Sequence, residues 1–272
     1  MRAVFFDLDG TLLNQDHQLS PPTIEVLNHL KKRQVKLCLA SGRTYHSMRP
    51  FYQQLGLNTP LISYNGAKIV YGDGHIDESP LPQFVLTELV KLSRQHNLHL
   101  NVYSQDRWYT EFPESSQAQT YGAVAHLKPY PADFNVLQQQ AITKALFIAS
   151  PDQLMTLESS IKSSLSEWVD TTSSMNHFLE ILSQGTNKGQ AVKKVCHHLD
   201  VPLNQTMAFG DGLNDLEMLS TVGHSVAMSN GRDILKTTAT ALAPHHADHG
   251  VAHYLNHYFE LNLDLADIPS KQ

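Results

Sequence analysis

Hydrophobic residues along this chain alternate between two spacings, one typical of buried strands and the other of amphipathic helices. Short runs rich in valine, leucine and phenylalanine at residues 3–6 and 35–40 predict buried strands. Between them, apolar residues recur at helical spacing over residues 24–30, after Ser20 and two prolines that favour a helix start. A second helix then precedes a strand at residues 61–64. This order predicts a parallel sheet with right-handed crossovers.

The last third of the chain returns to the same alternation of strands and helices. The elements predicted there are a helix at 186–199, strands at 206–209, 225–228 and 241–243, a short helix ending at Leu219, and a closing helix at 251–258. The tail after Glu260 is predicted to be poorly anchored. Ligands of parallel α/β sheets bind at the carboxyl ends of the strands, so functional residues are expected directly after them.

The middle of the chain has a different pattern, in which strands follow one another beside helices. The predicted elements are helices at 82–95 and 151–166, strands at 98–103, 108–112, 145–149, 168–172 and 177–182, and a turn-rich stretch around Pro113, Pro129 and Pro131. Such an order is typical of an α+β unit with an antiparallel sheet. We interpret residues 82–183 as a domain inserted into a Rossmann-like, doubly wound α/β core made of residues 1–81 and 184–272.

Composition narrows the class of protein. The chain has 272 residues, of which 41% are hydrophobic and 17% charged, which suits one large or two modest folded domains. The net charge of −6 does not indicate a basic surface for binding nucleic acid, so we expect no nucleic-acid partner. With no apolar run of membrane-spanning length and no leader before the first strand, we expect a cytoplasmic protein without a membrane partner. Cys38 and Cys196 are expected to be reduced core thiols.

Carboxylates follow two of the predicted parallel strands. Asp7 and Asp9 come after the first strand, and Asp211 and Asp215 come after the strand at 206–209. Crowded carboxylates repel one another unless a cation or a shared proton lies between them. Oxygen ligands without histidine or cysteine select Mg²⁺ over zinc. For the first pair alone, solvated aspartates at a strand end remain an alternative.

Other residues of the right chemistry lie at helix starts. Ser41 and Gly42 follow the second strand, where the start of a helix suits anionic oxygens. Lys188 begins another predicted helix and offers a point charge for a phosphoryl group. For Lys188 considered alone, a solvated surface lysine is the simpler interpretation.

Four stretches, in this order, resemble the motifs of the haloacid dehalogenase superfamily. They are Asp7-Leu8-Asp9-Gly10-Thr11, Ala40-Ser41-Gly42-Arg43, Thr186-Asn187-Lys188-Gly189 and Gly210-Asp211-Gly212-Leu213-Asn214-Asp215. They are most similar to the Cof-type phosphatases, whose class IIB cap domain lies between the second and third motifs. Residues 64–67, 228–230 and 248–251 also resemble stretches of that subfamily. The resemblance implies that the inserted domain is a cap over the active site.

The resemblance also implies a role for each matching residue. Asp7 would be the nucleophile that forms an aspartyl-phosphate, and Asp9 the general acid and then the general base. Mg²⁺ would be held by the Asp7 carboxylate, the Asp9 main-chain carbonyl and Asp211. Asp215 would support these ligands without binding the ion directly. The groups implied to hold the phosphoryl oxygens are the Leu8 N–H, Ser41, Gly42, Lys188 and Asn214. Ser41 stands where the family often has threonine, and the hydroxyl is kept.

Two clusters remain outside these motifs. Residues 245–249 contain three histidines near the predicted active edge, and either a transition-metal site or plain surface histidines would fit them, the second interpretation being preferred. Trp108 and Tyr109 could line the substrate surface of the cap, but we favour a place in the cap core.

The function predicted from these residues is a Mg²⁺-dependent phosphatase of small phosphorylated metabolites such as sugar phosphates, with nucleotides or pyridoxal phosphate as other candidates. A phosphomutase would use the same aspartyl-phosphate and return the phosphoryl group to its substrate. A non-catalytic regulatory protein on the same scaffold is the alternative from a different class, although Asp7, Asp9 and Asp211 are all present. The sequence does not indicate an oligomeric state.

Overall fold

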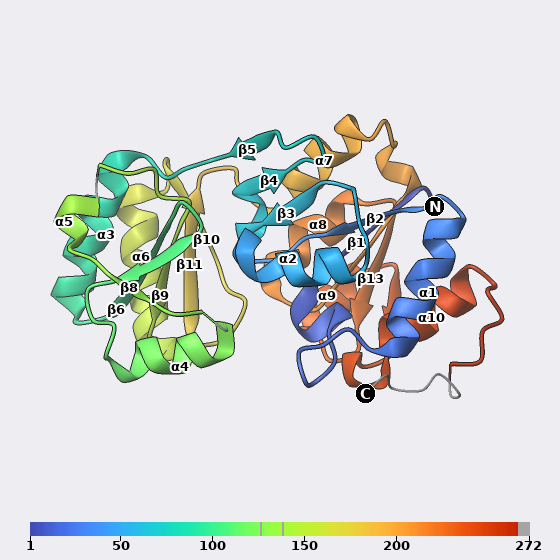
Figure 1. The fold of residues 1–272 in the computed structure, drawn as a ribbon. Helices are drawn as coiled ribbons and strands as arrows, with labels where there is room; N and C mark the ends of the chain where they lie inside the picture. The colour runs from blue at the N-terminus through green and yellow to red at the C-terminus, as the bar shows by residue number, and fades with distance from the viewer. Residues whose placement is uncertain (126, 138, 266–272) are drawn as a thin grey trace.

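The computed structural model describes residues 1–125, 127–137 and 139–265, which form two lobes (Figure 1). The lobe on the right of the figure contains both the N-terminal and the C-terminal parts of the chain, and the left lobe is built from its middle. The predicted α/β core with an inserted α+β cap is therefore confirmed. The domain boundaries at residues 81/82 and 183/184 stay a prediction.

The core contains a five-stranded, fully parallel sheet. Its strands are β1 (Ala3–Phe6), β2 (Lys36–Leu39), β12 (Thr206–Gly210), β13 (His224–Met228) and β14 (Ala241–Ala243), in the order β14-β13-β12-β1-β2. The interior strand β1 has all its residues buried, as expected for a parallel sheet covered on both faces.

Helices cover the two faces of this sheet. They are α1 (Pro21–Lys32), α2 (Tyr45–Gln54), α7 (Lys188–His198), α8 (Leu216–Thr221), α9 (Asp233–Thr238) and α10 (Gly250–Tyr258). Side chains alternate along a strand, so Phe6 packs into one hydrophobic cluster with Leu27 of α1 and Leu255 of α10. Phe5 packs into the opposite cluster with Val192 of α7. The core is therefore doubly wound, as predicted.

A hairpin sheet that the hydrophobic pattern did not predict extends the core. Strand β3 (Leu61–Ser63) touches the main sheet through the parallel bridge between Ala40 and Ile62. It then pairs antiparallel with β4 (Lys68–Val70), which pairs with β5 (Ile76–Glu78). The last two strands have only three residues each and β5 is largely exposed, so neither carries a clear alternation.

The cap is built on a six-stranded sheet that is antiparallel except for one short parallel pair. Its order is β10-β11-β9-β6-β7-β8, and the strands are β6 (His99–Ser104), β7 (Arg107–Thr110), β8 (Tyr130–Pro131), β9 (Lys144–Ile148), β10 (Val169–Thr172) and β11 (Phe178–Ser183). Helices α3 (Gln83–His96) and α6 (Pro151–Leu165) pack on one face, together with Phe147 and Ile181.

The other face of the cap sheet is directed toward the core. Leu146 and Leu182, which alternate with the residues under α3 and α6, pack there with Tyr64 from the core. Trp108 is 2% exposed in the same cluster, with its ring edge-on to Tyr121 at 5.0 Å between centroids. The prediction that Trp108 belongs to the cap core is therefore confirmed.

Two parts of the sequence prediction were wrong. The stretch at 113–131, predicted to be turns, contains α4 (Ser116–Ala125), and α5 (Phe134–Leu137) follows it. Helix α4 buries only Ala118 and Tyr121, so its sequence has little helical periodicity to read. Helix α9 was not predicted either, and its one buried residue is Leu235.

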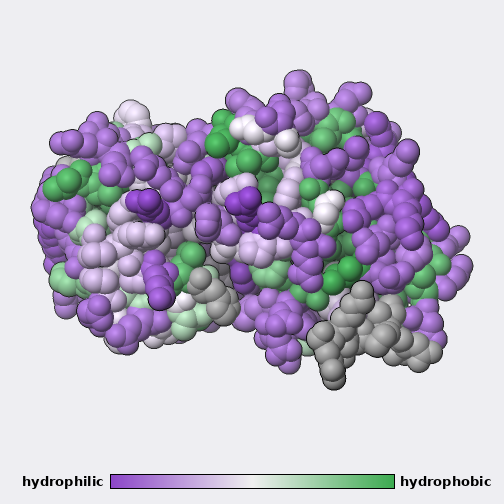
Figure 2. Space-filling model, in the orientation of Figure 1, coloured by the Kyte–Doolittle hydropathy of each residue, from purple (hydrophilic) through white to green (hydrophobic). Residues whose placement is uncertain are grey.

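The tail is better anchored than predicted as far as it is described. Leu261 and Leu263 pack against the core, and Leu265 is 8% exposed. The rest of that prediction concerns residues 266–272, which lie outside the described residues. Within the described part of the chain, no helix is both long and apolar enough to cross a membrane. Hydrophilic residues cover most of the face seen in Figure 2, and hydrophobic residues form small separate patches there.

Both cysteines are free and buried in the same cluster of the core, which confirms the prediction of two reduced core thiols. Burial raises the pKa of the Cys38 thiol to about 12 and that of Cys196 to about 11. The thiolate is the reactive form, so we expect iodoacetamide at pH 8 to leave both cysteines unmodified in the native protein. Mass spectrometry after unfolding in guanidinium provides the control, in which both should react. Rapid alkylation of the native protein would contradict this burial.

Candidate active site

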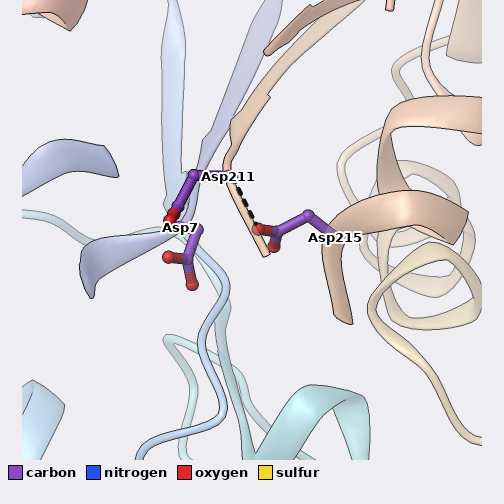
Figure 3. A group of neighbouring side chains, drawn as sticks. All are labelled: Asp7, Asp211 and Asp215. Carbon is purple, nitrogen blue, oxygen red and sulfur yellow. Dashed lines mark hydrogen bonds between the residues drawn. The ribbon is translucent and has the colours of Figure 1, made fainter. Parts of the chain in front are cut away.

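Three carboxylates converge at the carboxyl end of the parallel sheet (Figure 3). Asp7 directly follows β1 and Asp211 directly follows β12, and these two strands pair side by side. Asp215 comes from the 3₁₀ turn Leu213–Asp215 that precedes α8. One carboxylate oxygen from each of the three residues lies within 4.8 Å of the other two. The predicted strand-end arrangement thus brings residues 7, 211 and 215 together.

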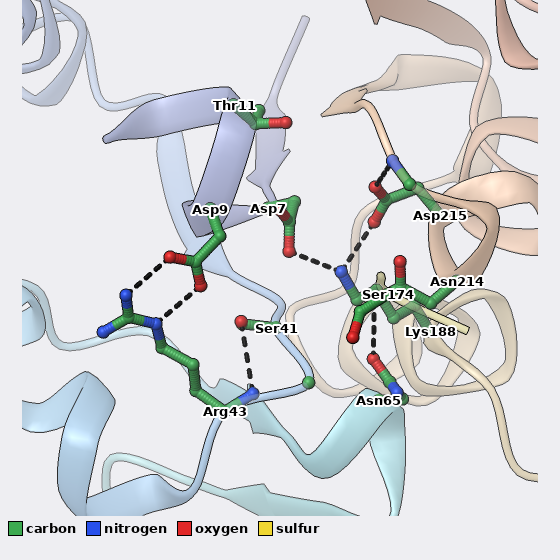
Figure 4. Close-up of polar contacts among 12 residues, drawn as sticks. Asp7, Asp9, Thr11, Ser41, Arg43, Asn65, Ser174, Lys188, Asn214 and Asp215 are labelled. Carbon is green, nitrogen blue, oxygen red and sulfur yellow. Dashed lines mark hydrogen bonds and ion pairs between the residues drawn. The ribbon is translucent and has the colours of Figure 1, made fainter. Parts of the chain in front are cut away.

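Lys188 lies between two of these carboxylates (Figure 4). Its Nζ donates to Asp7 Oδ1 at 2.5 Å and to Asp215 Oδ1 at 2.6 Å, and its side chain is 0% exposed. The surface-lysine interpretation is therefore wrong. Burial lowers the pKa of Lys188, but the charges of Asp215 and Asp7 outweigh it and raise the pKa above its usual value. The ammonium group stays protonated at neutral pH.

The backbone around Asp211 holds Asp215 in place. The N–H groups of Asp211 and Gly212 both donate to Asp215 Oδ2, at 2.9 Å each, and Thr11 Oγ1 donates to Asp211 Oδ1 at 2.8 Å. A Cβ added at Gly210 would come within 2.5 Å of the Asp215 Cβ, so this close approach requires glycine. Both oxygens of Asp215 accept hydrogen bonds from protein groups, which suits a supporting role for this carboxylate.

The electrostatics of the cluster fit a divalent cation. Burial raises the pKa of Asp7 well above its usual value; Lys188 lowers it in part, and the charges of Asp215 and Asp211 raise it further. Burial and the Asp215 charge raise the pKa of Asp211 to about 7, against the Thr11 hydrogen bond and Lys188. One lysine thus does not neutralise the carboxylates. An oxygen-only group with excess negative charge suits Mg²⁺.

Asp9 is held by an ion pair that the sequence analysis did not anticipate. Arg43 donates from Nε to Asp9 Oδ2 at 2.6 Å and from a terminal nitrogen to Oδ1 at 2.5 Å, and His17 Nδ1 lies 3.3 Å from Oδ1. Burial alone would raise the pKa of Asp9, but the hydrogen bonds and charge of Arg43, with His17, lower it below its usual value. Asp9 is therefore an ionised carboxylate in this arrangement.

The Ser41–Arg43 turn faces the same site. The Ser41 N–H donates to the Ile62 carbonyl at 3.0 Å, and the Arg43 N–H donates to Ser41 Oγ at 3.3 Å (Figure 4). The turn connects β2 to α2, whose N-cap is Thr44. Ser41 and Gly42 line the cavity above the carboxylates, as do Asp7, Asp9, Asp211 and Asn214, so all of these predicted site residues share one cavity.

This cavity has a volume of about 350 Å³ and lies between the core and the cap. The cap closes it with two kinds of side chain. The apolar ones are Tyr121, Val124, Ala125, Leu146, Met175 and Phe178. The polar ones are Lys144, Ser174 and Glu180. None of these cap residues was predicted from the sequence, because nothing in the motifs of the core specifies which face of the cap covers the cavity.

A polar network, formed by Lys144, Glu180, Asn65 and Asn214, joins cap and core beside the cavity. Lys144 Nζ donates to Glu180 Oε2 at 2.8 Å and to the Gly42 carbonyl at 2.9 Å. Asn65 Nδ2 donates to Glu180 Oε2 at 3.0 Å, and Asn214 Nδ2 donates to Asn65 Oδ1 at 2.9 Å. A sequence signal existed, since Glu180 interrupts the apolar run of β11 and Lys144 begins the apolar strand β9.

The histidine-rich stretch contributes one residue to the cavity. His246 lines it, and its Nδ1 lies 2.8 Å from the Leu13 carbonyl oxygen. His245 Nδ1 accepts a hydrogen bond from the Ala247 N–H at 3.1 Å. Among the described residues, the metal-ligand side chains that lie close enough to share one ion, as a group of three or more, are Asp7, Asp211 and Asp215. This group contains no histidine.

Comparison with known proteins agrees with this geometry. A family model for haloacid dehalogenase-like hydrolases matches residues 4–255. The chain is 34% identical over 262 residues to an HMP-PP phosphatase of Yersinia pseudotuberculosis, covering 94% of this chain and 95% of the relative. An HMP-PP phosphatase of Yersinia enterocolitica is 32% identical over 260 residues, with the same coverage.

A solved structure has the same fold. It is a haloacid dehalogenase-like hydrolase from Bacteroides thetaiotaomicron, which superposes with a TM-score of 0.86 at 26% identity, over 95% of this chain and 99% of that one. Together with the near-complete family match and the relatives above 30% identity, this likeness settles the family. The chain belongs to the haloacid dehalogenase-like hydrolases.

Proposed function

We propose that this protein is a Mg²⁺-dependent phosphatase that hydrolyses small phosphorylated metabolites through an aspartyl-phosphate on Asp7. The observation that carries the proposal is the position of Asp7: a buried carboxylate at a strand end, 2.5 Å from Lys188 Nζ and on the floor of a cavity roofed by the cap. The family match and the phosphatases among the relatives support the same reaction.

In the first step, an Asp7 carboxylate oxygen attacks phosphorus, an O–P bond forms, and the P–O bond to the leaving group breaks. Asp9 donates a proton to the departing oxygen. In the second step Asp9 takes a proton from water, which attacks phosphorus and releases Asp7 and inorganic phosphate. Because Arg43 lowers the pKa of Asp9 in the arrangement described, the acid role requires that substrate binding draw Arg43 away from this carboxylate.

The remaining site residues position charge for the transferred group. Lys188, Ser41 and Asn214, with the N–H groups of Leu8 and Gly42, would hold the phosphoryl oxygens while charge develops on them. The Asp7 carboxylate, the Asp9 carbonyl and Asp211 would hold Mg²⁺, supported by Asp215. When bound, the ion would neutralise phosphoryl charge, and the raised pKa values of Asp7 and Asp211 support such a cation partner.

The cap favours a compact leaving group with an apolar face. Two of its large hydrophobic side chains at the cavity, Val124 and Met175, are 38% and 41% exposed, beside the half-buried Phe178. The polar cap groups at the cavity are bonded within the protein: Ser174 donates to Glu180, and Lys144 bonds Glu180 and Gly42. We therefore rank HMP-PP, on which the relatives act by name, above sugar phosphates.

The experiment that tests the proposal is phosphate release from HMP-PP and a panel of phosphorylated metabolites, with and without Mg²⁺. We expect release that requires Mg²⁺ and disappears in Asp7→Asn, because the amide is not a nucleophile for phosphorus. Circular dichroism should show an unchanged fold. Isomerisation of a sugar phosphate without release would favour a phosphomutase, and a folded protein inert toward both reactions would favour a regulatory role.

Replacing Lys188 by methionine should damage both stability and activity. The change leaves the Asp7 and Asp215 carboxylates buried without their cation, so we expect a loss of about 3 kcal/mol or more in the free energy of unfolding. We expect kcat/KM to fall by about 100- to 1,000-fold, as when one donor to a developing oxyanion is removed.

The matched control is Lys194→Met on the same helix, since Lys194 forms an exposed ion pair with Asp77. Exposed pairs contribute about 0–1 kcal/mol, so this variant should behave like the wild type. Equal effects of the two substitutions would refute the assigned role of Lys188.

The apolar cap surface gives a further prediction. Phe178→Ser should lower kcat/KM about tenfold for esters with an apolar ring in the leaving group, such as phenyl phosphate, and leave acetyl phosphate unaffected. The control is Phe112→Ser, since Phe112 is also in the cap but is 66% exposed. An equal loss on both substrates would show that Phe178 does not contact the leaving group.

A further inference from the structure

A hydrogen-bond chain leads from the cap surface into the core beside the Ser41–Gly42 turn, which we propose to bind phosphate. It begins at Ser174, whose Oγ donates to Glu180 Oε1 at 2.7 Å. The other Glu180 oxygen accepts from Asn65 at 3.0 Å, and Asn65 accepts from Asn214 at 2.9 Å. Glu180, Asn65 and Asn214 are 3%, 1% and 7% exposed, so these bonds are shielded from water. Buried bonds of this kind fix orientation more firmly than exposed ones.

The carboxylate of Glu180 determines the direction of the whole chain. An ionised carboxylate only accepts hydrogen bonds, so the amide of Asn65 must turn its NH₂ group toward Glu180. The Asn65 oxygen is then left to face Asn214, which must turn its own NH₂ group inward. One amide hydrogen of Asn214 is used in this bond, and the second remains for the cavity that Asn214 lines.

The backbone of Asn65 is held in an uncommon conformation. Tyr64 and Asn65 have φ values of 51° and 54°, in the left-handed region that asparagine tolerates better than most residues. The Asn65 N–H donates to the Ser41 carbonyl at 3.0 Å. A Cβ added at Gly42 would lie 3.0 Å from Asn65 Oδ1, so the amide packs directly against this glycine. Asn65 therefore contacts two parts of the predicted phosphate cradle, the Ser41–Gly42 turn and Asn214.

Lys144 completes the connection from the cap. Its ammonium group pairs with Glu180 at 2.8 Å, and both side chains are 4% exposed. It also donates to the Gly42 carbonyl and lies 5.0 Å from the centroid of the Tyr103 ring. Lys144 and Glu180 are on the core-facing side of neighbouring strands β9 and β11. This one cap ion pair thus bonds both Asn65, through Glu180, and Gly42, through Lys144.

We propose that Asn65 and Glu180 are positioning residues that couple the docked cap to phosphate binding. Glu180 orients Asn65, and Asn65 orients the Asn214 amide and packs against Gly42. The phosphate cradle is then complete only when the cap strands β9 and β11 lie against the core. The proposal rests on the proposed function, because it takes Asn214 and Gly42 as groups that hold phosphoryl oxygens.

The test compares Asn65→Gly and Glu180→Gln with the wild type, using inorganic phosphate in the presence of Mg²⁺ as the probe. Glycine keeps the left-handed backbone and leaves the Lys144–Glu180 pair intact, so this variant should fold. The glutamine in Glu180→Gln can donate as well as accept a hydrogen bond, so the Asn65 amide is no longer forced to turn its NH₂ group toward this side chain. Inorganic phosphate has no leaving group, and its dissociation constant therefore reports the cradle alone.

We expect both variants to bind phosphate about tenfold more weakly, the fold-change that corresponds to one oriented hydrogen bond. The fall in kcat/KM should be equal for acetyl phosphate and for a larger ester. The control Glu158→Gln, in a partly exposed pair with Lys162 on the outer cap helix, should change neither quantity. Combining Asn65→Gly with Asn214→Ala should cost less than the sum of the two single effects, because Asn65 acts in part through Asn214.

Three results would overturn the proposal. Unchanged phosphate binding in folded Asn65→Gly would mean that the chain is structural only. A loss confined to large esters would mean that Glu180 contacts the leaving group directly. Additive effects of Asn65→Gly and Asn214→Ala would mean that the two amides act independently. In each of these cases the wild type still hydrolyses esters, whereas a wild type that neither binds phosphate nor releases it refutes the proposed function itself.

Discussion

The ammonium group of Lys188 lies fully buried between the carboxylates of Asp7 and Asp215, and the carboxyl end of the core sheet depends on this contact. Three carboxylates enter the same region from two neighbouring strand ends and the turn that follows β12. Without a buried cation their mutual repulsion would oppose folding. With only one buried lysine, negative charge remains in excess, which is the basis of the cation site that we propose. The same arrangement thus permits the fold and prepares the chemistry.

The active site is divided between two lobes with different tasks. The core contributes carboxylates, Lys188 and the Ser41–Gly42 turn, all fixed by strand ends and helix starts. The cap contributes an apolar surface and the Lys144–Glu180 pair, both on the core-facing side of its sheet. Alternation along β9 and β11 separates this side from the side that α3 and α6 cover. A change of leaving-group preference therefore need not disturb the carboxylates.

The core was largely predictable from the sequence, because strong local signals agree with the global arrangement there. Phe5 and Phe6 lie in an apolar run that ends in a carboxylate, and Ser20 caps its helix by accepting from the Thr23 N–H. The short strand β5 and the helix α4 were missed, since each buries too few residues to create a periodic pattern.

The site itself was only partly predictable, for a different physical reason. The strand-end rule brings Asp7 and Asp211 together. It does not specify that Arg43 holds Asp9, or that Glu180, 115 residues further along the chain, reaches Asn65. The Glu180–Asn65 contact depends on how the cap docks against the core, and the Arg43–Asp9 pair depends on the conformation of the Ser41–Arg43 turn; no local pattern encodes either.

The position of β1 has a consequence for how the protein is made. This strand lies inside the core sheet, between β2 and β12, and its residue Phe6 pairs with Phe209. The cap sheet, by contrast, is built from residues 99–183 alone. During synthesis the first strand emerges long before its neighbour β12, while the cap already has all of its strands. Because contacts of high sequence separation form slowly, we expect the cap to fold first and the catalytic edge to be assembled last.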